Sequence, residues 1–220
     1  MQNYTVLAID LAKHVFQVVK TTEYGKAAFN KKMNRTELKK LLCNEPKATV
    51  VMEACGGSHY WCRLAESFGH QVKALPARQV KPFRQGQKTD ANDAVAIATA
   101  ARQPHLKPAR VLSEEEQGLQ CIEKMRELQV AHKTALSNQL RGLLFEFGIV
   151  MSKSDAALKK ALPEILEDAE NGLPGGFRTA LAQIWALYLT IISELEKLSQ
   201  FQHQLTLQDE QGRALSALEG

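Results

Sequence analysis

Residues 4–10 read YTVLAID and residues 48–54 read ATVVMEA. Each is a short run of β-branched and aliphatic residues that ends at an acid, Asp10 in the first run and Glu53 in the second. Both runs predict strands, because such residues fit a pleated, half-buried surface. An acid at the end of an apolar strand is partly desolvated and needs a partner. Neither run contains a basic residue that could be this partner, so the acids mark the place where we expect a ligand.

The segments around these two strands alternate between strand and helix signals. Further strands are predicted over 14–20 and 26–31, which form a meander with the first strand, and over 71–75. Helices over 36–43 and 58–68 precede the later strands. A sheet that begins as a hairpin and gains strands through helical crossovers is a mixed α/β architecture.

A loop over 76–88, rich in proline and basic residues, is predicted before a helix from Asp90 to about Arg102. The helix begins with KTDANDA, so Asp90 and Asp93 are neighbours on its first turn. One acid there would be ordinary capping. Two like charges at this spacing repel each other, and either water or a bound cation must reduce the repulsion.

The second half of the chain has helical periodicity. Helices are predicted over 113–147 and about 155–170, and NGLPGG ends the second of them. The final helix carries apolar residues at alternating spacings of three and four from Leu181 to Leu205, as in a coiled coil. This stripe would pair either with a helix of the same chain or with a second copy.

The sequence disfavours two broad classes of protein, those that span a membrane and secreted proteins held together by disulfides. No apolar run approaches the roughly 20 residues needed to cross a bilayer. The four cysteines do not have the spacing of a disulfide framework, so we expect a cytoplasmic protein without a membrane partner. The net charge of +4 and the isoelectric point near 8.8 permit a polyanionic partner without requiring one.

Four acids are predicted to meet at one edge of the sheet: Asp10, Glu53, Asp90 and Asp93. Ligands of open α/β sheets collect at the carboxyl ends of strands. Four carboxylates in one place do not all stay ionised without a divalent cation, and ligand sets made only of oxygen favour Mg²⁺ or Mn²⁺ over zinc. Two such ions about 4 Å apart would activate a water or a 3′ hydroxyl and stabilise the leaving oxygen of a phosphodiester.

Three blocks of sequence, AIDLAKHVFQV, VVMEACGGSHYW and KTDANDAVAIA, resemble the motif blocks of the DEDD transposases of bacterial insertion sequences, a group that includes Piv-type DNA invertases. The resemblance implies an RNase H-like domain similar to the Holliday-junction resolvase RuvC, with Asp10, Glu53, Asp90 and Asp93 as its acidic tetrad. It also implies a C-terminal domain with a nucleophilic serine, and a structured bridge RNA that pairs with target and donor DNA. We expect this chain to end where the serine-bearing domain would begin.

Seven basic residues in and around the 76–88 loop are candidate nucleic-acid ligands: Lys73, Arg78, Lys81, Arg84, Lys88, Lys107 and Arg110. Beside a metal site such residues would hold phosphates through salt-sensitive contacts. The ordinary alternative is a solvated charged loop. Lys88 directly precedes the acidic helix, and we expect it to contact the scissile strand or to offset the carboxylates.

Two other kinds of chemistry are disfavoured. Cys55, His59 and Cys62 lie close together in the sequence, but a zinc site needs four ligands and only the distant Cys43 or His70 could add one. They are better explained as core or half-buried residues. The chain also lacks a GxxxxGK[ST] loop, which disfavours a nucleotide kinase or an ATPase.

We therefore expect two domains. Residues 1–111 would form an RNase H-like, Mg²⁺- or Mn²⁺-dependent catalytic domain. Residues 112–220 would form a helical region that assembles a homodimer or tetramer and helps to hold nucleic acid. The expected function is DNA transposition or site-specific recombination guided by a structured RNA. The alternative is a catalytically silent module that binds RNA or DNA and assembles, in which the acids only organise a bound ion.

Overall fold

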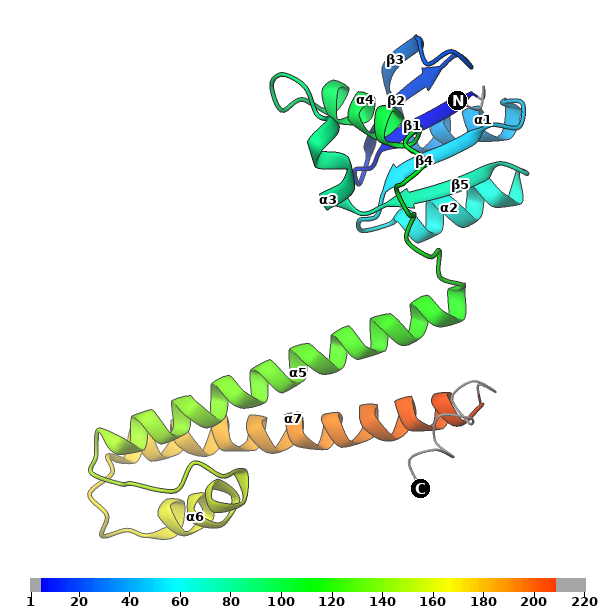
Figure 1. The fold of residues 1–220 in the computed structure, drawn as a ribbon. Helices are drawn as coiled ribbons and strands as arrows, with labels where there is room; N and C mark the ends of the chain where they lie inside the picture. Colours follow the sequence, from blue (N-terminus) through cyan, green and yellow to red (C-terminus); the bar gives the residue numbers. More distant parts are fainter. Residues whose placement is uncertain (1–4, 209–220) are drawn as a thin grey trace. The chain divides into compact units, whose positions relative to one another are not determined.

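The computed structural model of the chain describes residues 5–208. Its first part contains a five-stranded sheet in the order β3-β2-β1-β4-β5 (Figure 1). The strands are β1 (Val6–Asp10), β2 (Val15–Thr21), β3 (Ala27–Asn34), β4 (Thr49–Glu53) and β5 (Gln71–Leu75). β2 is antiparallel to both β1 and β3, and β4 is parallel to both β1 and β5. This topology confirms the mixed, RNase H-like sheet.

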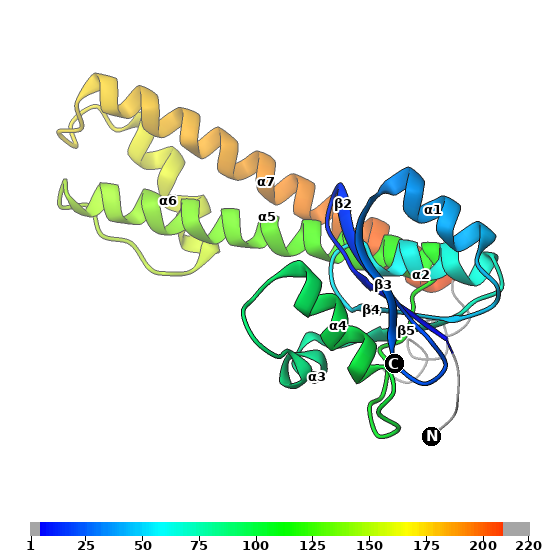
Figure 2. The same ribbon diagram turned by 90° about the horizontal axis from the view of Figure 1, so that it is seen from above.

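Helices cover both faces of the sheet (Figure 2). One face packs against α1 (Arg35–Asn44) and α2 (Ser58–Ser67). The other packs against α4 (Asp90–Ala100). Because side chains alternate along a strand, β1 contributes Leu7 and Ile9 to the core on the first face and Val6 and Ala8 to the core on the second. Burial on both faces explains why β1 reads as a continuous apolar run.

The segment predicted as a loop over 76–88 is partly helical. It contains the short helix α3 (Ala77–Val80) and a 3₁₀ turn (Lys81–Phe83), so the loop prediction is wrong for these residues. Val80 is buried in the core beneath α4, and this contact holds the turn in place. Pro82 stands at the start of the 3₁₀ turn, where its fixed φ suits a helical conformation and its missing N–H removes no helical hydrogen bond.

Helix α4 meets the sheet through small side chains. Its buried residues are four alanines and one isoleucine: Ala94, Ala96, Ile97, Ala98 and Ala100. They pack against Val6, Ala8 and Val51 of the central strands. Small residues on a helix allow its backbone to come close to the surface that it covers, and α4 lies across β1 and β2.

The chain divides into two compact units between Gln117 and Gly118. The second unit contains most of α5 (Glu114–Phe145), together with α6 (Asp155–Glu167) and α7 (Gly175–Gln208). Within residues 5–208, no helix combines the length and the apolar character of a bilayer-spanning segment.

The apolar stripe predicted on the final helix packs within the same chain. Leu181 and Tyr188 of α7 are buried in one core with Leu140 of α5 and Leu158 of α6. Farther along the two long helices, the side-chain amide of Gln202 donates to Glu123 Oε2 at 2.7 Å. The stripe therefore forms an intramolecular helical hairpin here, and association with a second copy stays a prediction.

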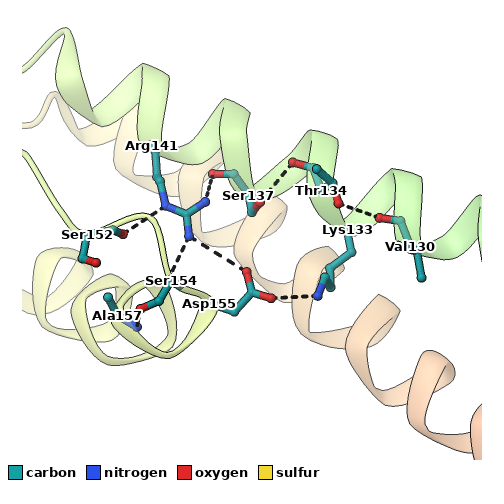
Figure 3. A network of polar contacts seen from close by, with 9 residues as sticks. All are labelled: Val130, Lys133, Thr134, Ser137, Arg141, Ser152, Ser154, Asp155 and Ala157. Carbon is teal, nitrogen blue, oxygen red and sulfur yellow. Dashed lines mark hydrogen bonds and ion pairs between the residues drawn. The ribbon is translucent and has the colours of Figure 1, made fainter.

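Arg141 joins the loop before α6 to α5 (Figure 3). Its guanidinium donates to the carbonyl oxygens of Ser152 at 3.3 Å and Ser154 at 3.0 Å, and to that of Ser137 within α5 at 3.2 Å. In the same network Lys133 lies 2.7 Å from Asp155 and holds the pKa of this carboxyl below its usual range. One forked side chain thus satisfies three backbone carbonyls.

Replacing Arg141 with alanine should open the start of α6. The change removes three charge-assisted hydrogen bonds from a mostly buried side chain, and we expect a local loss of about 2 kcal/mol. Hydrogen exchange at the Ala157 and Leu158 amides should then become about thirty-fold faster. Arg141→Lys should recover less than half of the protection, because an ammonium lacks the fork. Lys124→Ala is the control at an exposed position of α5, and equal exchange in the two alanine variants would contradict the prediction.

Candidate functional site

The strands bring Asp10 and Glu53 to the same end of the sheet, where β1 and β4 finish. β1 and β4 are parallel, and their register runs from Val6 opposite Thr49 to Ile9 opposite Met52. Asp10 and Glu53 are the next residues of the two strands, and both side chains are half-buried. The structure therefore places these two acids side by side at the carboxyl ends of neighbouring strands, as expected.

The other two acids belong to the first turn of α4. Thr89 is the N-cap of this helix, and its hydroxyl accepts a hydrogen bond from the Asn92 amide at 3.3 Å. Neither Asp90 nor Asp93 is therefore the N-cap residue. The Asp93 side chain is 27% exposed, whereas that of Asp90 is 66% exposed and lies 3.6 Å from the Lys32 ammonium. The two acids thus differ in burial and in their cationic partners.

The four acids act on one another electrostatically. Burial raises the pKa of Asp10 to about 6, and repulsion by Asp93, Asp90 and Glu53 adds to this increase. In an isolated aspartate at a strand end, burial alone would raise the pKa. The raised pKa of Asp10 therefore reflects its burial first and the three neighbouring carboxylates second.

A pocket of about 350 Å³ lies between the sheet edge and the segment before α4. Three of the acids line it: Asp10, Glu53 and Asp93. Four of the predicted basic residues line it as well: Arg78, Lys81, Arg84 and Lys88. The Arg84 guanidinium lies 3.5 Å from an Asp93 carboxylate oxygen, so the two sets of charges are in direct contact inside one cavity.

The other three predicted basic residues do not line this pocket. Lys73 is on β5, and its ammonium donates to the carbonyl of Ala101 at 3.3 Å. Arg110 forms an ion pair with Glu116, and Lys107 is exposed in the loop after α4. These three residues are close to the acidic helix in the sequence, but their side chains lie outside the pocket.

Two amide side chains that the sequence reasoning missed connect the sheet to the acidic turn. The Gln17 amide donates to Asn30 Oδ1 at 2.5 Å, and the Asn30 amide donates to the carbonyl of Ala91 at 3.1 Å. Gln17 is opposite Asp10 in the β1–β2 ladder and only 6% exposed. A polar residue at an inward position of the run HVFQVVK was the signal that could have identified it. The relay fixes the peptide between Asp90 and Asp93.

Asn30→Ala should loosen the first turn of α4. It removes the bond to Ala91 and leaves the buried Gln17 amide without its acceptor, and we expect a loss of about 1–2 kcal/mol in the free energy of unfolding. Thermal denaturation and hydrogen exchange at Asn92 and Asp93 would measure the effect. Asn44→Ala removes an exposed asparagine from the end of α1 and serves as the control. If Asn30→Ala had the same midpoint of thermal denaturation as Asn44→Ala, the role of the relay would be contradicted.

The acids fit a hard divalent cation in their chemistry. The set is made only of oxygen ligands, and it carries a mutual repulsion that such a cation would relieve. Among residues 5–208, however, no three His, Cys, Asp or Glu side chains converge as a preformed ligand set. Asp93 is instead paired with Arg84. Cys55, His59 and Cys62 do not form a metal site either: His59 Nδ1 accepts the Leu112 amide at 3.1 Å, and only Cys62 of the two thiols is buried.

The family model of the IS110-type DEDD transposases, described as "Transposase", matches residues 7–149. A "Probable family 20 transposase" of Pseudomonas aeruginosa is 36% identical over 168 residues, which are 76% of this chain and 50% of that protein. The "Transposase for insertion sequence element IS1111A" of Coxiella burnetii is 31% identical over 205 residues, 93% of this chain and 56% of that protein. The chain thus spans about half the length of these relatives.

Solved structures are similar over part of the chain. One of them is "T. thermophilus RuvC in complex with Holliday junction substrate", with a TM-score of 0.36 and 14% sequence identity. The match covers 48% of this chain and 99% of that one.

Proposed function

The chain belongs to the IS110 family of DEDD transposases, and from this premise we propose that residues 1–111 are the catalytic domain of a DNA transposase or site-specific recombinase. The reaction would be divalent-metal-dependent cleavage and transfer of phosphodiester bonds. One observation carries the proposal: a single pocket is lined by Asp10, Glu53 and Asp93 and also by four basic side chains. Carboxylates suit a cation and basic groups suit the phosphates of the same strand.

The two sets of side chains would divide the work. Asp10, Glu53, Asp90 and Asp93 would hold Mg²⁺ or Mn²⁺, which when bound supplies Lewis-acid activation of the attacking oxygen and stabilises the leaving one. The basic residues of the pocket would hold the phosphates on either side of the scissile bond through charge-assisted hydrogen bonds. This arrangement orients the strand before any bond is broken, which is a large part of catalysis in phosphoryl transfer.

Arg84 would have two successive partners. Its guanidinium lies against Asp93, where it offsets part of the repulsion among the acids. A cation held by Asp93 would take over this role, and the guanidinium would then be available to a phosphate. Arginine suits the exchange because its planar fork matches carboxylate and phosphate oxygens alike.

The partners and the second unit complete the proposal. We propose DNA and a structured guide RNA as partners, and a cytoplasmic site of action on the bacterial chromosome. The helical hairpin of α5 and α7 would serve as scaffold and as the contact between copies in a homodimer or tetramer. The relatives are longer than this chain, and a serine-bearing domain in the additional length would act together with the tetrad.

The alternative function is a nucleic-acid-binding and assembly module without catalysis. The Arg84–Asp93 ion pair favours it, because the acids already have a positive partner. The experiment that separates the two is metal-dependent strand cleavage by the longer protein, compared between the wild type and an Asp10→Asn/Asp93→Asn variant with RNA and DNA binding measured in parallel.

A further inference from the structure

The basic residues that line the pocket around Asp10, Glu53 and Asp93 (the acidic pocket) form one positively charged surface. A second one lies on the opposite face of the sheet. It is formed by Arg35 and Lys39 of α1 and by Tyr60 of α2, and we refer to it as the α1–α2 surface. Both helices pack on the sheet face that contains Leu7 and Ile9, whereas the pocket is beside α4 on the other face. A strand held in the pocket would therefore not account for these residues.

The two cations of this surface are grouped around aromatic rings. The Arg35 guanidinium carbon lies 5.0 Å from the centre of the Trp61 ring and 5.6 Å from that of Tyr60. The Lys39 ammonium lies 5.7 Å from the centre of the Tyr60 ring. These contacts are within the range of cation–π attraction, and they place both positive charges at one half-exposed tyrosine.

No acid of the described chain neutralises this pair. Arg35 and Lys39 are four residues apart on one helix, where like charges repel. Among residues 5–208 neither has a carboxylate at ion-pair distance, and the nearby Glu37 is engaged in the capping box of α1. The pKa of Tyr60 is held below its usual range by Lys39 first and then by Arg35. The surface therefore has an excess of positive charge that an anion would balance.

The platform beneath the charges is rigid. Trp61 is 2% exposed and packs edge to face on Phe16 with ring centres 4.9 Å apart. Tyr60 packs on Trp61 at 5.4 Å and keeps 36% of its surface exposed. Cations and a ring that are already ordered lose little conformational entropy when they bind a ligand. Arg35 and Lys39 are thus in contact with an aromatic platform whose base is buried in the core.

We propose that the α1–α2 surface binds a single-stranded nucleic acid, with Arg35 and Lys39 on its phosphates and a base stacked on Tyr60. Single strands suit this surface because their bases are free to stack on an exposed ring, whereas duplex bases are not. Lys31, held over Phe29 on the neighbouring edge strand at 4.8 Å, extends the charge along the same face. The proposal stands independently of catalysis in the pocket, because no residue is shared between the two.

The test is fluorescence anisotropy of this chain with labelled single-stranded RNA, single-stranded DNA and duplex DNA of equal length. Arg35→Ala/Lys39→Ala should weaken single-strand binding at least about ten-fold and reduce the slope of log K against log salt by about 1.4. Tyr60→Leu should weaken it about ten-fold, and Tyr60→Phe should bind nearly as the wild type does. The RNA and DNA arms show which single strand is preferred, and a preference for either supports the proposal.

The controls distinguish binding at the α1–α2 surface from non-specific attraction by positive charge elsewhere on the chain. Lys159→Ala/Lys160→Ala removes the same charge from exposed positions of α6 and should leave binding within about two-fold. The readout is binding and requires no cleavage, so failure of the catalytic proposal would not affect this result. If the Arg35 variant does not fold, Lys39→Gln leaves Arg35 on Trp61 and should lower the salt slope by about 0.7. Three results would overturn the proposal. The α6 control could lose as much single-strand affinity as the Arg35/Lys39 variant, or that variant could lose as much affinity for duplex DNA as for single strands. Polyglutamate could also displace the single strand completely.

Discussion

An Asp10→Asn/Asp93→Asn variant of the longer protein should lose metal-dependent strand cleavage by about a thousand-fold or more. Loss of a single preorganised electrostatic group at an active site costs about 10²–10³ in rate, and this variant removes one proposed metal ligand from the strand end and one from α4. Both side chains line the acidic pocket, and asparagine keeps their size while removing the charge that a divalent cation needs. Cleavage of DNA that carries the ends of the element, with Mg²⁺ or with a chelator, gives the measurement.

Binding provides the necessary comparison for this variant. RNA and DNA affinities should stay within a few-fold of wild type, because the basic residues of the pocket are retained. Asp168→Asn, at an exposed position after α6, makes one such Asp→Asn change far along the sequence from the tetrad and should cleave normally. Unchanged cleavage by the double variant would remove the basis for the catalytic proposal and leave the binding and assembly module as the explanation.

The single change Asp10→Asn should make the metal-free chain more stable at neutral pH. The pKa of Asp10 is raised from 3.8 to about 6 in the folded chain, so the folded state binds this proton more tightly than the unfolded state does. Stability therefore falls as the pH rises from about 4 to about 6, and the full penalty is present above pH 6. Two pKa units correspond to about 3 kcal/mol, which partial exposure of the carboxylate reduces to about 1–2 kcal/mol.

Urea denaturation with a chelator present, at pH 4 and at pH 7.5, would measure this gain. Asn is uncharged at both values, so the variant should exceed the wild type at pH 7.5 and match it closely at pH 4. Asp90→Asn is the comparison, since that side chain is mostly exposed and paired with Lys32. A variant that is less stable than wild type at pH 7.5 would mean that Asp10 is held by favourable partners and is not short of a cation.

The features that could be predicted from the sequence are those set by local pattern. Apolar runs that end at an acid located β1 and β4, and their parallel pairing placed Asp10 beside Glu53. The turn chemistry of KTDANDA located the start of α4, although the cap is Thr89. The positions of these elements depend on residues a few positions apart, whose geometry the backbone largely determines, whereas the pairing of β1 with β4 joins strands that are distant in the sequence.

The features that could not be predicted depend on contacts between distant residues. The hydrogen bond from Asn30 to Ala91 spans 61 positions, and nothing near Asn30 in the sequence indicates it. Lys73 looked like a member of the basic loop, but its place on β5 directs its ammonium to Ala101. The stripe on α7 has the same period whether its partner is α5 or another copy, so only the three-dimensional structure could show the intramolecular packing.

The alanine face of α4 has a consequence for the acids at its first turn. A methyl group has no rotamers, so a helix seated on the sheet through alanines keeps a nearly constant height above it, whereas longer side chains would let that height vary. Asp93 is attached to this helix and Asp10 to the strand beneath it. The thickness of a layer of methyl groups therefore acts as a spacer between the two carboxylates, and uncharged residues determine how far apart the charged ones are held.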